Sequence, residues 1–118
     1  MHRARSFVAP IIGVGLAIAA ALTSAAPASA QQAVTVSVTL KDDKFIPSEI
    51  SVPANRPIVI RVKNLDAEEI EFESVSLRVE KVIAAKSEGV VNVRALSPGR
   101  YEFFDDFHPK ARGTLVVK

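Results

Sequence analysis

The chain has 118 residues, with 15 Lys and Arg against 13 Asp and Glu, 48% hydrophobic residues and no cysteine. This length is enough for one small domain with a single hydrophobic core. The absence of cysteine excludes disulfide staples, a thiolate nucleophile, a cysteine-bound iron–sulfur cluster and thiolate-bound copper.

The first thirty residues have the three parts of a secretory signal peptide. Arg3 and Arg5 are basic, residues 7–22 form an apolar run, and residues 28–30 read Ala-Ser-Ala, a small-x-small cleavage site. We therefore expect cleavage after residue 30 and export to the periplasm. A retained anchor is the alternative, but the run is at the short end of the roughly 17–25 apolar residues that a spanning helix needs.

Cleavage would leave one domain over residues 31–118. Without Arg3 and Arg5, the 15 basic residues become 13, equal to the 13 acidic ones. A domain of balanced charge has no electrostatic reason to bind nucleic acid or an anionic membrane.

Short runs of alternating apolar and polar residues fill the predicted domain, which favours β-strands. Pro47 and Pro53 place residues 45–52 at a sheet edge, because proline cannot donate to a central ladder. No stretch has convincing helical periodicity, so the pattern indicates an all-β, antiparallel sandwich or barrel. In chain order, strands are expected over residues 33–40, 45–52, 57–64, 70–73, 77–83, 89–96, 99–104 and 113–118.

Two motifs cover most of these strands. The first is F-x-P-x-x-I-x-V-x-A-x-x-P at residues 45–57, followed by I-x-V-x-N at 60–64. The second is P-G-x-Y-x-F at residues 98–103, followed by G-x-L-x-V at 113–117. Together they resemble the two halves of cupredoxin domains, which implies a cupredoxin-like Greek-key β-sandwich of seven to eight strands.

The resemblance also implies where copper ligands would stand. In copper-carrying cupredoxins a tyrosine is followed four residues on by a cysteine and three further by a histidine, often with a methionine before the final glycine. Here Tyr101 is followed at those offsets by Asp105 and His108, and no methionine lies between His108 and Gly113. The first histidine of the family falls on Ile70. A blue-copper centre is therefore excluded.

Three shorter strings are similar to a narrower group. They are E-F-E-S at residues 71–74, R-x-E-K at 78–81 and Y-x-F-F-D-D-F-H at 101–108. They resemble the small EfeO-type periplasmic cupredoxin-like proteins found with bacterial ferrous-iron permeases. This resemblance implies handling of iron or copper beside an inner-membrane iron permease and other periplasmic components.

His108 is the only histidine left once His2 is removed with the signal peptide. It stands in a predicted loop, residues 104–109, which a Greek-key sandwich brings beside the connection at 68–73. Imidazole with hard oxygen ligands suits iron, Mn(II), Zn(II) or Cu(II), but not Cu(I). We expect His108 and Glu73 as the principal metal ligands, with Asp105, Asp106 and Glu71 as further candidates.

Structural interpretations compete with each of these assignments. Strand parity turns Glu71 and Glu73 away from the buried face, so they reach the site only if they lie near a strand end. Asp105 and Asp106 can instead stabilise a turn by accepting backbone N–H bonds. Glu68 and Glu69 are typical of a solvated loop pair, and the Tyr101 hydroxyl is expected to tie down the last loop as a tyrosine corner does.

Three functions remain open. The first is a metal-binding accessory protein that receives or presents iron or Cu(II) without turnover. The second is a degenerate cupredoxin that acts as a protein-interaction module of a permease complex. The third is a ferrous oxidase or electron-transfer component, which the missing thiolate disfavours. A hydrolytic nucleophile would need a histidine beside a serine, and no serine is marked in this way, so hydrolysis is not expected. Oligomeric state stays open, because the edge strand at 45–52 could pair between copies.

Overall fold

The computed structural model describes residues 32–118 together with the isolated residues 4, 8, 13, 15 and 17. The predicted signal peptide and its cleavage site therefore lie outside the continuous described segment. Among the residues described, no helix has the length and hydropathy needed to cross a membrane.

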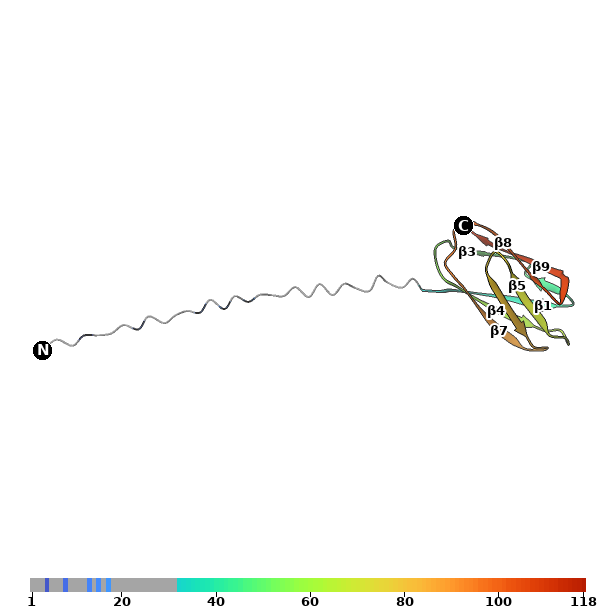
Figure 1. The fold of residues 1–118 in the computed structure, drawn as a ribbon, viewed down its shortest axis with the longest axis horizontal. Coiled ribbons are helices and arrows are strands. Elements are labelled where there is room, and N and C mark those ends of the chain that lie inside the picture. The colour runs from blue at the N-terminus through green and yellow to red at the C-terminus, as the bar shows by residue number, and fades with distance from the viewer. Residues whose placement is uncertain (1–3, 5–7, 9–12, 14, 16, 18–31) are drawn as a thin grey trace.

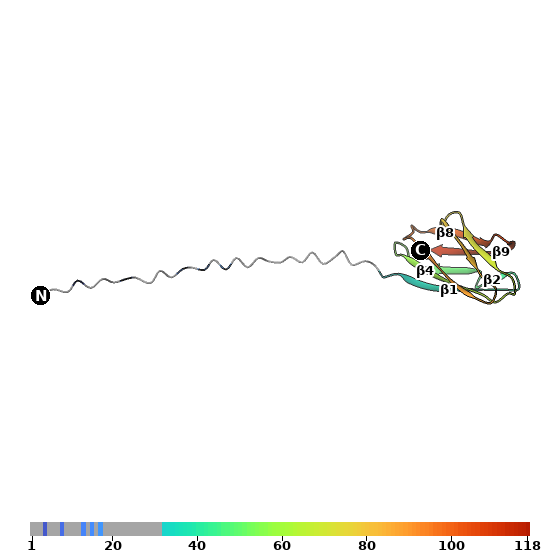
Figure 2. The same ribbon diagram turned by 60° about the horizontal axis from the view of Figure 1, so that its bottom comes forward.

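Residues 32–118 form nine strands and no helix (Figure 1). Their bounds are β1 Val34–Lys41, β2 Lys44–Ile46, β3 Glu49–Val52, β4 Ile58–Asn64, β5 Ile70–Ser74, β6 Val79–Ile83, β7 Glu88–Val93, β8 Gly99–Asp105 and β9 His108–Val117. They build a four-stranded sheet in the order β2-β1-β4-β7 and a five-stranded sheet in the order β3-β9-β8-β5-β6. The two sheets face each other across one core, which confirms the predicted all-β sandwich (Figure 2).

The sandwich has one strand more than the upper limit expected from the sequence. The edge strand predicted over residues 45–52 is divided at Pro47 into β2 and β3, which are edges of different sheets. The pairs β1–β4 and β3–β9 are parallel, which differs from the antiparallel pairing predicted from the sequence; the other pairs are antiparallel. A proline without an N–H fits this point, where the chain leaves one ladder for another.

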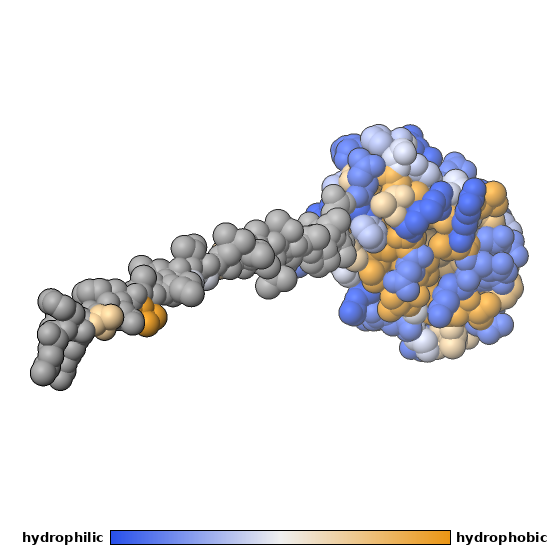
Figure 3. Space-filling view, turned by 60° about the vertical axis from the view of Figure 1, so that its left-hand side comes forward, coloured by the Kyte–Doolittle hydropathy of each residue, from blue (hydrophilic) through white to orange (hydrophobic). Residues whose placement is uncertain are grey.

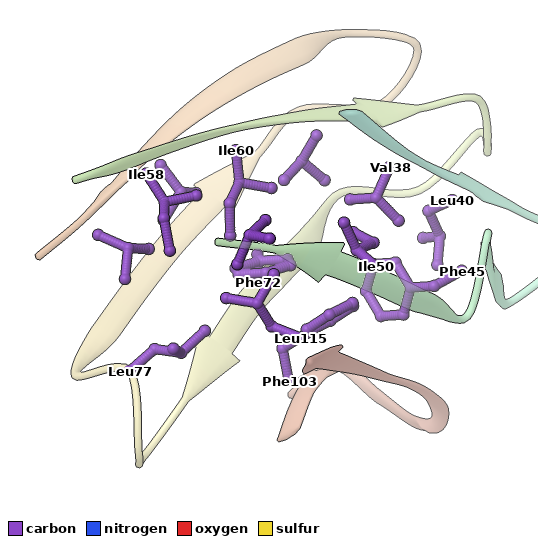
Figure 4. Packing of buried hydrophobic residues seen from close by; sticks show 14 of the residues in the cluster. Val38, Leu40, Phe45, Ile50, Ile58, Ile60, Phe72, Leu77, Phe103 and Leu115 are labelled. Atoms are coloured by element: carbon purple, nitrogen blue, oxygen red, sulfur yellow. The ribbon is translucent and has the colours of Figure 1, made fainter. Parts of the chain in front are cut away.

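The core follows the predicted two-residue period. On β4, Ile58, Ile60 and Val62 are all buried, as expected. Phe45, Phe72 and Phe103 form a contiguous aromatic cluster with ring centroids 4.9–5.9 Å apart (Figure 4). Such ring pairs add stability beyond the area they bury.

Polar and apolar side chains are interspersed over the outer surface shown in Figure 3. Val75, Val82 and Val90 are exposed on this domain, which is ordinary for single surface hydrophobes. The Tyr101 hydroxyl donates to the Ser97 carbonyl at 2.8 Å, so it ties down the connection between β7 and β8 and not the last loop, between β8 and β9.

The two ends of the sandwich carry different parts of the chain. At one end the Val34 N–H donates to the Pro57 carbonyl, and the Lys118 N–H donates to the Val52 carbonyl. At the other end lie the β1–β2 turn, the loop at residues 65–69 and the β8–β9 turn, which contain the predicted metal ligands or their neighbours.

Candidate metal-binding site

The β8–β9 connection is tighter than the loop predicted over residues 104–109. β8 ends at Asp105 and β9 begins at His108, so only Asp106 and Phe107 form the turn. Asp105 and His108 are paired across the hairpin, next to an irregularity in the register at Phe104 and Asp105. The two residues that match the family's cysteine and histidine positions are therefore direct neighbours.

Asp105 is a buried anchor with both carboxylate oxygens in use. Its side chain is 0% exposed. Oδ1 accepts the N–H of Glu71 at 2.9 Å and the N–H of Phe107 at 3.1 Å, and Oδ2 lies 2.7 Å from His108 Nδ1. These bonds hold β5 against the β8–β9 turn. Turn stabilisation, the alternative interpretation from the sequence, is thus present.

His108 has a carboxylate at each ring nitrogen. Nδ1 lies against Asp105, and Nε2 lies 2.6 Å from Oε2 of Glu68. The His108 side chain is 27% exposed and that of Glu68 is 75% exposed. Hydrogen bonds to Asp105 and then Glu68 raise the pKa of His108, while partial burial opposes them.

Glu68 is the site residue that the sequence interpretation missed, because it was assigned to a solvated pair. Its carboxylate is solvated, but it is also bound to His108. The sequence did point to Glu68 in one way, because Glu68 lies in the connection that was predicted to lie beside the His108 segment. Asn64 fixes this connection from inside: its amide donates to the Glu68 carbonyl at 2.8 Å, and its Oδ1 accepts the Asp66 N–H at 3.0 Å.

A pocket of about 270 Å³ lies beside His108 and Glu68. Asp42, Asp43 and Asp66 complete its acidic lining. The Asp66 carboxylate accepts the N–H groups of Asp42 at 2.8 Å and Asp43 at 3.1 Å, and both donors have positive φ angles. These backbone hydrogen bonds, the one from Asp43 above all, lower the pKa of Asp66. The Asp66 charge is therefore used to hold the strained β1–β2 turn.

A second acidic group lies on the outer face of the five-stranded sheet. One carboxylate oxygen from each of Glu71, Glu73 and Asp106 lies within 4.8 Å of the others. Glu80 stands directly opposite Glu73 on β6. Partial burial, a hydrogen bond with Glu80 and the charges of Glu80, Asp106 and Glu73 raise the pKa of Glu71 to about 7. Glu71 is therefore partly protonated at neutral pH.

The five predicted ligands thus fall into two groups. Asp105 and His108 form one group with Glu68, and Glu71, Glu73 and Asp106 form the other, which we call the carboxylate cluster. Within residues 32–118, the carboxylate cluster is the only set of three or more metal-ligating side chains with mutually close ligand atoms, and it lacks His108. Asp105, the last residue of β8, is buried, whereas Asp106 lies in the two-residue turn and is exposed.

The backbone joins the two groups. The Glu71 N–H donates to Asp105, and the Asp106 N–H donates to the Glu71 carbonyl at 2.9 Å. This arrangement places a buried carboxylate, an imidazole and an outward carboxylate cluster at one end of a β-sandwich.

Residues 14–117 match the family described as cupredoxin-like domain. The chain belongs to the cupredoxin-like domain family. Among curated proteins it is 37% identical over 83 residues to the uncharacterized protein RP394 of Rickettsia prowazekii (strain Madrid E). That match covers 70% of this chain and 66% of the relative, slightly under two thirds of its length.

Solved structures show the same fold. The metal binding domain of the Cu(I) exporting P-type ATPase CopA from Streptococcus pneumoniae D39 matches with a TM-score of 0.65 and 16% identity, covering 71% of this chain and 84% of that one. Auracyanin A, a "blue" copper protein from Chloroflexus aurantiacus, matches with a TM-score of 0.62 and 16% identity, covering 74% and 100%. The predicted cupredoxin fold is confirmed, whereas the narrower EfeO-type resemblance stays a prediction.

Proposed function

We propose that this cupredoxin-like protein binds a hard metal ion, iron or Cu(II), through the carboxylate cluster. In this proposal it is an exported, periplasmic accessory protein of an iron-uptake system, without a type 1 copper centre and without turnover. The observation that carries the proposal is the convergence of oxygens from Glu71, Glu73 and Asp106 within 4.8 Å of one another.

The charge of the cluster supports cation binding. Partial burial, together with the hydrogen bond with Glu80 and the charges of neighbouring carboxylates, raises the pKa of Glu71 to about 7. A bound cation would relieve the part of this shift that comes from charge repulsion. Carboxylate oxygens suit hard ions, whereas Cu(I) requires sulfur. The chain has no cysteine, and its single methionine is Met1.

Different observations support export and a role in iron uptake. Residues 1–30 have the composition of a cleavable signal peptide. The strings at residues 71–74, 78–81 and 101–108 resemble EfeO-type proteins, whose partners include an inner-membrane iron permease. Two of these strings contain the carboxylate cluster, so the resemblance and the geometry point to the same residues.

The interaction-module function has one observation in its favour. Phe107 is 44% exposed beside Asp106, as an apolar lip for a partner would be. This function needs the fold and the turn but no metal, so metal titration separates the two.

Calorimetric titration of the purified protein with Fe(II) under anaerobic conditions, Mn(II), Zn(II) and Cu(II) tests the proposal. Glu73→Gln should weaken binding at least about tenfold, because it removes one ligand without changing size. Glu102→Gln is the matched control, since Glu102 lies on the same sheet in β8 but outside the cluster. If the wild-type protein binds none of these ions, the interaction-module function replaces metal binding.

A further inference from the structure

The histidine predicted to be the principal ligand has no ring nitrogen left for a metal. An imidazole has two nitrogens, and in this structure each lies within hydrogen-bonding distance of a carboxylate. A metal at Nδ1 would have to displace Asp105, which is fully buried and also serves two backbone N–H groups. A metal at Nε2 would have to displace Glu68.

The same contacts form a continuous path into the carboxylate cluster. Glu68 contacts His108, His108 contacts Asp105 Oδ2, and Asp105 Oδ1 accepts the Glu71 N–H. The Glu71 carbonyl in turn accepts the Asp106 N–H. Rotation of Asp105 would therefore break the hydrogen bonds from the Glu71 and Phe107 N–H groups, beside two of the three cluster carboxylates.

We propose that His108 is a positioning residue for the carboxylate cluster and not a metal ligand. The imidazole fixes the orientation of Asp105, and Asp105 fixes the spacing between Glu71 and Asp106. Partners of this kind outside the ligand set typically change metal affinity 10–100-fold. The proposal rests on metal binding at the cluster and defines the donor set there as oxygen only.

An oxygen-only donor set narrows the range of metal ions that the cluster would bind. Hard cations such as iron and Mn(II) accept carboxylate ligands alone, whereas Cu(II) and Zn(II) gain from imidazole. The rival arrangement is a metal in the 270 Å³ pocket, bound by His108 Nε2 and Glu68 after their mutual contact opens. The first arrangement has no nitrogen ligand at the metal, whereas the rival arrangement has one, His108 Nε2.

Cu(II) is the stringent probe, because it takes imidazole readily wherever a ring nitrogen is within reach. Pulsed electron paramagnetic resonance of the wild-type protein with one equivalent of Cu(II) should show no modulation from a coordinated imidazole. Imidazole modulation that disappears in His108→Asn would overturn the positioning role while leaving metal binding intact. Absence of Fe(II), Mn(II), Zn(II) and Cu(II) binding in wild type would remove the proposed function and this inference together.

Mn(II) affinities of three variants complete the test. His108→Asn should weaken binding about 10–100-fold, and Glu73→Gln at least about tenfold. Glu68→Ala should change affinity no more than about fivefold, the effect of an exposed ion pair. Glu68 is 75% exposed, so this variant remains informative if His108→Asn folds poorly. A large loss in Glu68→Ala with none in Glu73→Gln would place the metal in the pocket and overturn the proposal.

Discussion

Asp105 shows how one side chain can join several segments of the chain. It lies where copper-carrying cupredoxins have a cysteine, and its two oxygens serve two backbone N–H groups and one imidazole. A carboxylate without a cation partner would be costly inside a core, and these contacts offset that cost. Asp106, the next residue, is exposed and contributes to the cluster instead.

We predict that Asp105→Ala lowers the free energy of unfolding by about 2–5 kcal/mol, because two N–H groups lose their acceptor at a buried position. Asp106→Ala should stay within about 0.5 kcal/mol of wild type, since its side chain is exposed. Urea unfolding followed by circular dichroism measures both. Equal stability of the two variants would show that Asp105 does not anchor the turn.

A second prediction at this scale concerns the protons of Glu71. Its pKa of about 7 leaves it partly protonated at neutral pH, and a metal requires the carboxylate. Metal binding at pH 7 should therefore release roughly half a proton, falling towards zero by about pH 9. Calorimetry in two buffers of different ionisation enthalpy counts these protons. Glu71→Gln should release none, and unchanged release in that variant would assign the proton elsewhere.

At the scale of elements, β8 and β9 pack unusually closely against each other at one pair of residues. Gly113 on β9 is paired with Phe103 on β8, and the phenyl ring covers the glycine. A Cβ at Gly113 would overlap this ring and lie 3.1 Å from the Ser48 carbonyl. Phe103 cannot move aside freely, because it packs against Phe45 and Phe72.

Gly113→Ala should accordingly destabilise the fold by about 1–3 kcal/mol, the usual cost of overpacking a core. Gly99→Ala is the matched control on the same hairpin. A Cβ there meets only Tyr101, at an ordinary 3.4 Å, so its stability should be unchanged or slightly higher. Thermal unfolding of both variants provides the comparison, and a neutral Gly113→Ala would contradict the packing argument.

Strand parity predicted much of this architecture but not the shape of the site. Ile58 and Phe72 are buried and Glu73 points outward, as a two-residue period requires. Side chains alternate between two faces only in a strand, and residues 104–109 were predicted as a loop. The opposite directions of Asp105 and Asp106 could therefore not be predicted from the sequence. The Glu68–His108 contact depends on loop conformation, which sequence period does not determine.

At the scale of the whole molecule, three titrating groups at one end make stability depend on pH. His108 and Glu71 have raised pKa values in the folded state. The stability that these two groups contribute is fully present below their unfolded-state pKa values, about 6.5 for His108 and 4.5 for Glu71. It is lost as the pH rises through their pKa values in the folded state. Asp66 has a lowered pKa, so its contribution is present above 3.8 and is lost on acidification.

The metal-free protein should therefore be more stable at pH 5 than at pH 8. The urea midpoint at the two values measures this, and Glu71→Gln together with His108→Asn should remove most of the difference. Saturating metal should raise the midpoint at pH 8 in wild type, because it binds only the folded state. A higher metal-free midpoint at pH 8 than at pH 5 would contradict the assigned directions.

The carboxylate cluster lies at the end of the sandwich opposite the start of β1 and residue Lys118. Both ends of the described domain can therefore carry a tether, a dye or a fusion partner without covering the carboxylate cluster. A protein immobilised through either terminus would present Glu71, Glu73 and Asp106 to the solution. Surface-based binding assays with a candidate permease domain can thus use either orientation of attachment.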